Sequence, residues 1–361
     1  MPGTDEATTI EPRINSLLEL IERQHRRRGA AAQICIIRHG EVVLDRAIGC
    51  APDALFAIYS ASKPFAALLV HLLAEREQLK LDDPVARYWP EFAQHGKGSI
   101  TIRHALQHRA GIPVTGGLIG TVLHMHDWTK AIRDVERTKP RWPPGEVPAY
   151  HFISYGFILG ELVGRVSGRP IRQFLTDELL KPLGLDDIYL GLPDHALTRA
   201  VPVIATHPSE IMNQWLTNRR STRQCVAPAA SMSSTAPQLA RFYQMLLRGG
   251  ALAGVRVMRP ETVAAARALS SDGIDGFIKR RVRWAQGFQL GGPNDAHDLT
   301  RLLGVTSSPD AFGHAGNASC VTWADPSRDL VAVYLSNLQH GIDRGIAHLG
   351  EISDAAIAAF G

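Results

Sequence analysis

The sequence is poor in cysteine, with four in 361 residues: Cys35, Cys50, Cys225 and Cys320. None of them forms a C-x-x-C pair or a zinc-finger pattern, which argues against a redox dithiol and against a zinc-binding module. Three lie in apolar stretches typical of strands, where a free cysteine behaves as a small hydrophobic residue. We therefore expect these three to be core residues.

The chain also lacks long hydrophobic runs, since no stretch approaches the length needed to span a bilayer. Its first twelve residues are polar and acidic, whereas an export signal starts with basic residues and continues with an apolar run. These features predict a cytoplasmic protein with no membrane partner.

Neither sign of charge predominates, because 39 basic and 35 acidic residues leave a formal net charge of only +4. The two basic clusters, residues 26–28 and 279–281, are short and isolated. Such clusters are typical of helix ends and loops, so we expect no nucleic-acid partner.

Several catalytic motifs are missing. The sequence contains no G-x-G-x-x-G, no Walker A pattern and no G-x-S-x-G, so neither a nucleotide cofactor nor an α/β-hydrolase serine is predicted. His124-Met125-His126-Asp127 resembles part of the metallo-hydrolase pattern H-x-H-x-D-H but lacks its last histidine. We interpret this segment as a loop that lines a cleft, and we expect no metal and no cofactor.

What is present is typical of a globular chain, with 45% hydrophobic and 20% charged residues, enough for one large or two closely packed domains. The spacing of apolar residues predicts helices over residues 10–28, 102–108, 153–166, 171–180, 236–247 and 342–359. A hairpin pattern covers residues 32–38 and 41–49, and a second covers 320–324 and 330–335.

Strands at both ends of the chain, with helices between them, predict an α+β fold. We expect an antiparallel sheet flanked by helices and built by residues 10–75 and 251–361. Residues 76–250 would form an inserted, mainly helical lobe. A cleft between the two parts is the expected place of a functional site.

The most informative motif is Ser60-Ala61-Ser62-Lys63, which lies between an extended segment and a helix predicted over residues 64–74. A serine at the start of a helix lies beside free N–H groups and the positive end of the helix dipole. Lys63 follows on the same face and can reach the serine oxygen. Because a buried lysine loses its proton more readily than an exposed one, this S-x-x-K pair has the chemistry of a serine acyl-enzyme.

Two later segments supply candidates for the rest of such a site. Tyr150 can act as a base if a nearby cation such as Lys63 stabilises its phenolate; without that partner it would be a half-buried loop tyrosine. Residues 313–317 precede the C-terminal hairpin, and their glycines let backbone amides approach a ligand closely. An amide there could bind an oxyanion together with the amide of Ser60.

In this order, S-x-x-K, the Pro-Gly…Tyr segment and His-Ala-Gly resemble the motifs of the serine β-lactamase and penicillin-binding protein superfamily. The connecting segments 81–92, 100–113 and 155–160 are similar to those of the class C-related enzymes called family VIII carboxylesterases. The resemblance spans residues 32–338 and implies a β-lactamase-like fold.

The resemblance also implies roles by position. Ser60 would be the nucleophile, Lys63 its activating neighbour and Tyr150 the general base. The backbone amides of Ser60 and Asn317 would form the oxyanion hole. Contacts to the substrate would come from His151, Phe152, His314 and Gly316.

Two departures from the family pattern bear on the substrate. His151-Phe152 stands where class C β-lactamases have Ser-Asn, and His314-Ala315 stands where β-lactamases and penicillin-binding proteins have Lys-Thr. Both changes make the pocket less polar, which favours a neutral ester over a charged lactam.

We therefore predict a serine hydrolase that cleaves small carboxylic esters through an acyl-Ser60 intermediate. Alternatives are an acyltransferase that uses the same acyl-enzyme, β-lactamase or D-aminopeptidase activity, and a catalytically silent scaffold. The sequence also leaves a homo-oligomer possible, and it does not define the natural substrate.

Overall fold

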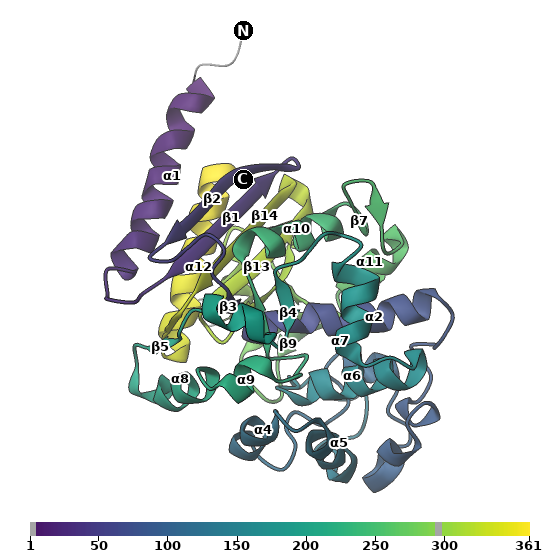
Figure 1. Cartoon of the computed structure of the whole chain (residues 1–361). Coiled ribbons are helices and arrows are strands. Elements are labelled where there is room, and N and C mark those ends of the chain that lie inside the picture. The colour runs from purple at the N-terminus through teal and green to yellow at the C-terminus, as the bar shows by residue number, and fades with distance from the viewer. Residues whose placement is uncertain (1–4, 293–297) are drawn as a thin grey trace.

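The computed structural model describes residues 5–292 and 298–361. Its largest sheet has eight strands (Figure 1). The strand order is β2-β1-β14-β13-β12-β11-β10-β9, and all neighbouring strands are antiparallel. The N-terminal and C-terminal parts of the chain meet at β1 and β14, in a register that runs from Ala32 opposite Ser336 to Arg38 opposite Leu330. The predicted sheet built from both termini is thus confirmed.

The strands of this sheet are β1 (Ala32–Arg38), β2 (Glu41–Ile48), β9 (Ser271–Ile274), β10 (Arg281–Trp284), β11 (Gln289–Leu290), β12 (Phe312–Gly316), β13 (Cys320–Asp325) and β14 (Leu330–Ser336). Shorter strands form small separate sheets: β3 (Phe56–Ala57), β4 (Ile188–Leu190), β5 (Ile204–Ala205), β6 (Met232–Ser234), β7 (Ala251–Leu252), β8 (Val255–Arg256) and β15 (Leu338–Gln339).

The helices are α1 (Asp5–Gln24), α2 (Lys63–Glu75), α3 (Ile102–Leu106), α4 (Leu118–His124), α5 (Trp128–Arg137), α6 (Ser154–Ser167), α7 (Ile171–Leu175), α8 (Ile211–Thr217), α9 (Arg220–Gln224), α10 (Ala236–Leu247), α11 (Pro260–Arg267) and α12 (Ile342–Phe360). The helix predicted over residues 171–180 ends earlier, because the chain continues from Leu175 into a π-helical turn, Thr176–Leu180.

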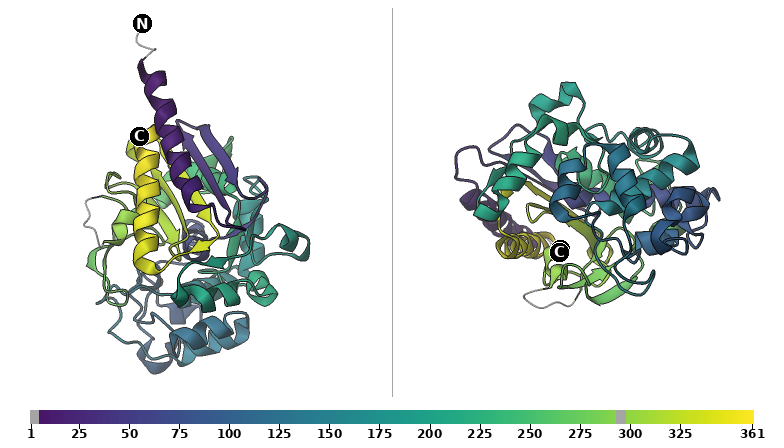
Figure 2. Two further views of the ribbon diagram at one scale, coloured as in Figure 1. Left: turned by 90° about the vertical axis from the view of Figure 1, so that its left-hand side faces the viewer. Right: turned by 90° about the horizontal axis from the view of Figure 1, so that it is seen from below.

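Helices cover both faces of the sheet. α1 and α12 lie side by side on one face (Figure 2, left) and share a core cluster with Ile34 and Ile36 of β1. Cys35 and Ile37 belong to the cluster on the opposite face, which includes α2 and α10. This division follows from the two-residue period of a strand, which sends successive side chains to opposite faces.

The helices α3 to α9 form a second layer beside α2 (Figure 1). α2 connects the two parts, since it is buried along almost its whole length and packs on α6. α10, which the predicted division at residue 250 assigns to the helical lobe, packs on β1, β13 and β14.

A strand that the sequence analysis did not predict precedes the C-terminal hairpin. Residues 313–316, expected to lie at the mouth of the C-terminal hairpin, are part of β12 and pair with β11 and β13 in the interior of the sheet. Gly316 suits this position, because a Cβ there would lie 2.1 Å from the backbone oxygen of Ile58. The end of β12 can therefore contact the turn that carries Ser60.

Candidate active site

Ser60 lies in a short 3-10 turn, η1 (Tyr59–Ser62), that leads directly into α2. Pro64 occupies the first turn of this helix, where its missing N–H costs nothing. Tyr59 has a φ of +46°, a conformation that is uncommon for a residue with a side chain. The chain thus turns sharply between β3 and α2, and Ser60 lies at this turn.

Two side chains from distant parts of the sequence contact the Ser60 hydroxyl. The Tyr150 hydroxyl lies 2.7 Å from Ser60 Oγ, and Lys63 Nζ lies 3.2 Å from the same atom. The structure therefore brings the three predicted catalytic side chains together around one oxygen.

Lys63 is fully buried, and its Nζ also lies 2.8 Å from the carbonyl oxygen of Phe152 and 3.4 Å from that of Ala229. Burial lowers the pKa of Lys63 well below its usual value, which favours the neutral amine. A neutral amine has two hydrogens and one lone pair, and a carbonyl oxygen can only accept. With its hydrogens directed to the two carbonyls, Lys63 can accept the hydroxyl hydrogen of Ser60.

Tyr150, in contrast to Lys63, keeps its proton. Burial, the largest effect, raises its pKa above the usual value, and the nearby carboxylate of Asp275 raises it further. Tyr150 is therefore a neutral phenol at rest and donates its hydrogen to Ser60 Oγ. The ring stacks on Trp284 at a centroid distance of 5.3 Å and packs against His108 at 5.1 Å.

The backbone of Tyr150 is fixed by Asp275, a residue that the sequence analysis missed. Asp275 is buried, and its two carboxylate oxygens lie 3.1 and 2.9 Å from the Tyr150 amide nitrogen, which donates to them. The same carboxylate accepts the indole N–H of Trp284 at 3.1 Å. One buried carboxylate thus orients both the candidate tyrosine and the aromatic ring stacked on it.

The expected oxyanion hole lies at the junction of η1 and β12. Asn317 follows the end of β12, and both Asn317 (φ +43°) and Ala318 (φ +53°) turn the chain toward β13. Ser60 lies in η1, and Asn317 lies between β12 and β13. Among the described residues, neither backbone N–H donates a hydrogen bond to the backbone of another segment. Both amides are thus available for a substrate oxygen, although this role stays a prediction.

The side chain of Asn317 belongs to a second network that the sequence analysis did not identify. Its Nδ2 donates to Oε1 of Gln339, which also accepts from Nδ2 of Asn213 at 2.7 Å. Gln339 is completely buried in β15, and Asn213 lies on α8. This amide therefore ties the predicted oxyanion loop to α8.

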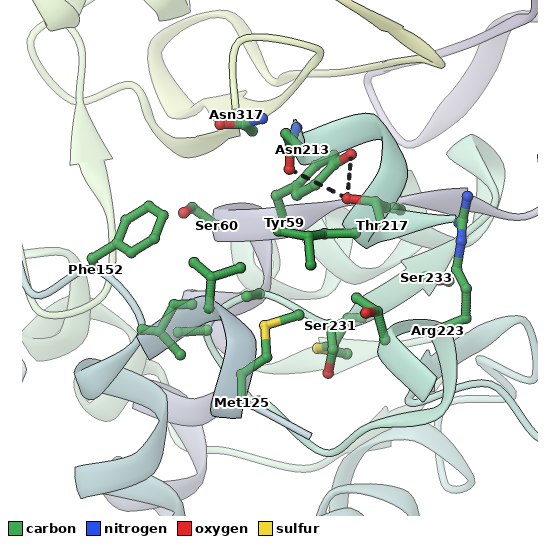
Figure 3. A pocket seen from close by; sticks show the side chains of 18 residues that line it. Tyr59, Ser60, Met125, Phe152, Asn213, Thr217, Arg223, Ser231, Ser233 and Asn317 are labelled. Carbon is green, nitrogen blue, oxygen red and sulfur yellow. Dashed lines mark hydrogen bonds between the residues drawn. The ribbon is translucent and has the colours of Figure 1, made fainter. Parts of the chain in front are cut away.

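A cavity with about 660 Å³ of empty volume, part of it open to solvent, leads away from Ser60 (Figure 3). Phe152 and Asn317 lie beside Ser60 at one end of it, and Arg223 lies at the other (Figure 3). Most of the wall is apolar and includes Val122, Met125, Ile153, Leu216 and Met232. The cavity therefore suits an uncharged organic group attached to Ser60.

Of the four residues predicted to contact substrate, the cavity wall includes Phe152 but not His151, His314 or Gly316. His151 is completely buried behind the site, where its Nε2 accepts the Ile112 N–H at 3.2 Å. His314 is buried beside Tyr150, with ring centroids 6.4 Å apart.

His314 does not replace the positive charge of the family lysine. Burial, the largest effect, lowers its pKa to about 3, so the imidazole is neutral. Its Nδ1 lies 2.7 Å from the carbonyl oxygen of Ala315 and therefore carries the hydrogen. Its Nε2 is buried and has no hydrogen-bond partner among the described residues.

The described part of the chain shows no group of three or more potential ligands placed to hold a metal ion. Of residues 124–127, expected to be a loop at a cleft, His124 ends α4 and the other three connect it to α5, with Met125 in the cavity wall. Among the helices that the structure describes, none combines the length and the apolar character of a membrane span.

Comparison with known proteins defines the family. The Beta-lactamase family matches residues 13–357, and the chain belongs to this family. It is 27% identical over 317 residues to the esterase/beta-lactamase LipL of Mycobacterium tuberculosis, an alignment that covers 79% of this chain and 70% of LipL.

Two solved structures are similar over almost their entire length. A family VIII carboxylesterase superposes with a TM-score of 0.82 at 26% identity, covering 97% of this chain and 98% of that one. A penicillin-binding protein homologue from Caulobacter crescentus has the same TM-score at 29% identity, covering 96% and 97%. The predicted fold is confirmed, and the protein is an esterase-like serine hydrolase of the β-lactamase family.

Proposed function

We propose that this protein is a carboxylesterase that cleaves small carboxylic esters through a covalent acyl-Ser60 intermediate. The observation that supports it best is the position of Ser60 Oγ, 2.7 Å from the Tyr150 hydroxyl and 3.2 Å from Lys63 Nζ. A nucleophile with both a base and an acid in hydrogen-bond reach is what acyl transfer needs.

Acylation starts when Ser60 Oγ attacks the ester carbonyl carbon and its proton moves to the neutral amine of Lys63. The carbonyl oxygen becomes an oxyanion that accepts hydrogen bonds from the Ser60 and Asn317 amides. The intermediate collapses as the ester C–O bond breaks, and Tyr150 gives its proton to the leaving alkoxide. The Lys63 ammonium then returns a proton to the Tyr150 phenolate, which leaves acyl-Ser60 and a free alcohol.

Deacylation repeats these steps with water. Water attacks the acyl carbon and its proton moves to Lys63, and the second collapse releases the carboxylic acid and restores the Ser60 hydroxyl. This scheme differs from the family role first expected for Tyr150. The directions of the two pKa shifts favour Lys63 as the resting base and Tyr150 as the proton donor.

The surroundings of the cavity favour a neutral ester over a β-lactam. A β-lactam carries a carboxylate that needs a cationic anchor near the nucleophile, whereas His314 is neutral at the position of the family lysine and Arg223 lies at the far end of the cavity. The apolar wall formed by Val122, Met125 and Ile153 has the same preference, because burying a charge without a partner is costly.

The test is turnover of p-nitrophenyl esters of increasing acyl length by the wild type and by Ser60→Ala. We expect hydrolysis by the wild type, none by the variant, and an acyl adduct on the Ser60 peptide by mass spectrometry. A matched control is Ser167→Ala, at the C-terminal end of α6. Equal turnover by Ser60→Ala would disprove the assignment, and ester products formed in added alcohol would instead indicate acyl transfer.

A further inference from the structure

Large exposed hydrophobic side chains gather on α8. Ile211, Met212 and Trp215 are 61%, 63% and 55% exposed, and all three lie within five residues. Single exposed hydrophobic residues are normal, whereas a contiguous group marks a contact surface. We call these three side chains the α8 surface.

The opposite side of the same helix forms part of the catalytic cavity. Asn213, Leu216 and Thr217 line the cavity that contains Ser60, and Figure 3 shows Asn213 and Thr217 at its wall. The α8 surface is therefore the outer side of that wall. α4 is similar, since Val122 lines the cavity and the adjacent Leu123 is 40% exposed.

Basic residues follow the α8 surface along the chain, whereas Glu210 directly precedes it. From residue 211 to residue 224 the chain has three arginines and no aspartate or glutamate. Arg220 pairs with Asp194 and Arg223 is buried, whereas Arg219 is exposed and forms no ion pair with a described residue. Its guanidinium lies 4.8 Å from the centroid of the Trp215 ring.

The area of the α8 surface distinguishes between two possible partners, a second copy of the chain and a lipid surface. Three partly exposed side chains offer a few hundred Å², far less than the roughly 800 Å² per partner of a stable protein interface. A second copy of the chain would therefore gain too little area. A lipid surface needs only a few inserted apolar side chains with Trp and Arg at the level of the headgroups, which is the composition found here.

We propose that the α8 surface binds anionic lipid surfaces and thereby brings the Ser60 cavity to esters dissolved in them. Ile211, Met212 and Trp215 would enter the acyl boundary, and Arg219 would contact the negatively charged headgroups. Only the consequence for catalysis rests on the proposed esterase function, because binding can be measured without turnover. The proposal departs from the expectation that the sequence alone suggested, which was a protein with no membrane partner.

The experiment is co-sedimentation of the full chain with vesicles of phosphatidylcholine and phosphatidylglycerol. We compare the wild type with the double variant Met212→Ser/Trp215→Ser and with the control Ile274→Ser, whose side chain is 66% exposed on β9. We expect the double variant to bind at least about tenfold more weakly and the control to bind like the wild type. Arg219→Gln should weaken binding mainly to vesicles that contain phosphatidylglycerol.

Turnover of a water-soluble p-nitrophenyl ester separates this proposal from the proposed function. The double variant should keep that turnover and lose turnover of an ester embedded in the vesicles. Absence of wild-type binding, or equal binding by the double variant, would overturn the proposal. A dimer of the wild type that the double variant loses would also overturn it, because the surface would then join two copies.

Discussion

The hydroxyl of Ser60 has two neighbours, Lys63 and Tyr150, whose pKa values burial shifts in opposite directions. The pKa of Lys63 is lowered and that of Tyr150 is raised, in both cases mainly by desolvation. Because desolvation disfavours whichever form is charged, it leaves an amine that can accept a proton and a phenol that can donate one. The apolar surroundings thus prepare both groups without a formal charge at rest.

This arrangement predicts the pH dependence of catalysis. Activity should rise with pH as Lys63 loses its proton, through a pKa below the usual value of lysine. Tyr150→Phe should lower kcat by a factor of about 100 to 10,000, while the acidic limb of kcat/KM keeps its position. The measurement is a pH–rate profile of both proteins. If Tyr150→Phe removes the acidic limb, the base is Tyr150 instead.

Asp275 permits a second prediction at the scale of one side chain. In Asp275→Asn one acceptor becomes an NH₂ group that faces N–H donors of Tyr150, Phe277, Ile278 or Trp284. Hydrogen bonds to a charged acceptor are worth about 1.5–3 kcal/mol each. We expect a loss of stability of this order in urea unfolding and at least a tenfold lower kcat.

The control is Asp272→Asn, three residues earlier on β9. Asp272 is partly exposed and forms ion pairs with Arg281 and Arg283, and such pairs contribute only about 0–1 kcal/mol. A folded Asp275→Asn protein with the kcat of the wild type would show that Asp275 does not position Tyr150.

The sequence could predict that Ser60, Lys63 and Tyr150 come together, because each lies in a short motif with its own chemistry. Asp275 and Gln339 could not be predicted, since their roles depend on contacts with residues far away in the sequence. An aspartate after a strand normally indicates a turn at the surface. His314 was found by its motif, but its tautomer and neutral state follow from burial that the motif does not encode.

At the scale of elements, the strand patterns predicted four of the eight strands of the main sheet, namely β1, β2, β13 and β14. α10 and β1 have the predicted bounds, and the two hairpins differ from prediction by a residue at one or more ends. β12 was missed because Gly313, Ala315 and Gly316 have little strand preference. Their small size is explained by what β12 contacts, namely Trp323 on β13 and the Ser60 turn.

The contact between β12 and η1 gives a testable requirement. In Gly316→Ala, the added Cβ would lie 2.1 Å from the Ile58 oxygen, so the end of β12 must move away from Ser60. Because an oxyanion hole tolerates little displacement, we expect kcat to fall by about 100-fold or more. Steady-state kinetics, with circular dichroism to confirm folding, provide the measurement.

Gly98→Ala serves as the reference for this substitution. Gly98 is exposed, and a Cβ there meets nothing closer than 3.9 Å. It should behave like the wild type. A Gly316→Ala enzyme with normal kcat would mean that the amide of Asn317 does not bind the oxyanion.

At the scale of the whole molecule, buried histidines link stability to pH. Burial lowers the pKa of His340 to about 4 and that of His348 to about 3, and it also lowers that of His25. These imidazoles lie close together, with His340 and His348 at a centroid distance of 5.5 Å. Protonation in the folded state would place positive charges side by side in the core.

The direction of this pH dependence follows from the difference in proton binding between the folded and the unfolded state. An unfolded histidine binds a proton below its usual pKa of about 6.5, whereas these residues remain neutral in the fold, so the unfolded state binds more protons. Stability is therefore complete above pH 6.5 and decreases as the pH falls toward 4, by about 1.4 kcal/mol per pH unit for each such imidazole. Urea unfolding at several pH values should show this slope, and His348→Gln should reduce it.

The result that would contradict this interpretation is an unchanged slope in His348→Gln. The comparison with His348→Gln isolates this contribution, because burial also lowers the pKa of His71 to about 4 and raises that of Asp45, so other groups affect the slope as well.

The main sheet pairs β1 with β14, so it can form only after both strands have been synthesised. Ser60 is synthesised before β12, Asn317 and β14, which lie more than 250 residues further along the chain. A nascent chain on the ribosome therefore carries the proposed nucleophile Ser60 without the Asn317 amide of the proposed oxyanion hole, and β1 has no β14 to pair with. We therefore expect the proposed activity to appear only after β12 and β14 have been synthesised, and a chain truncated before β12 to be inactive.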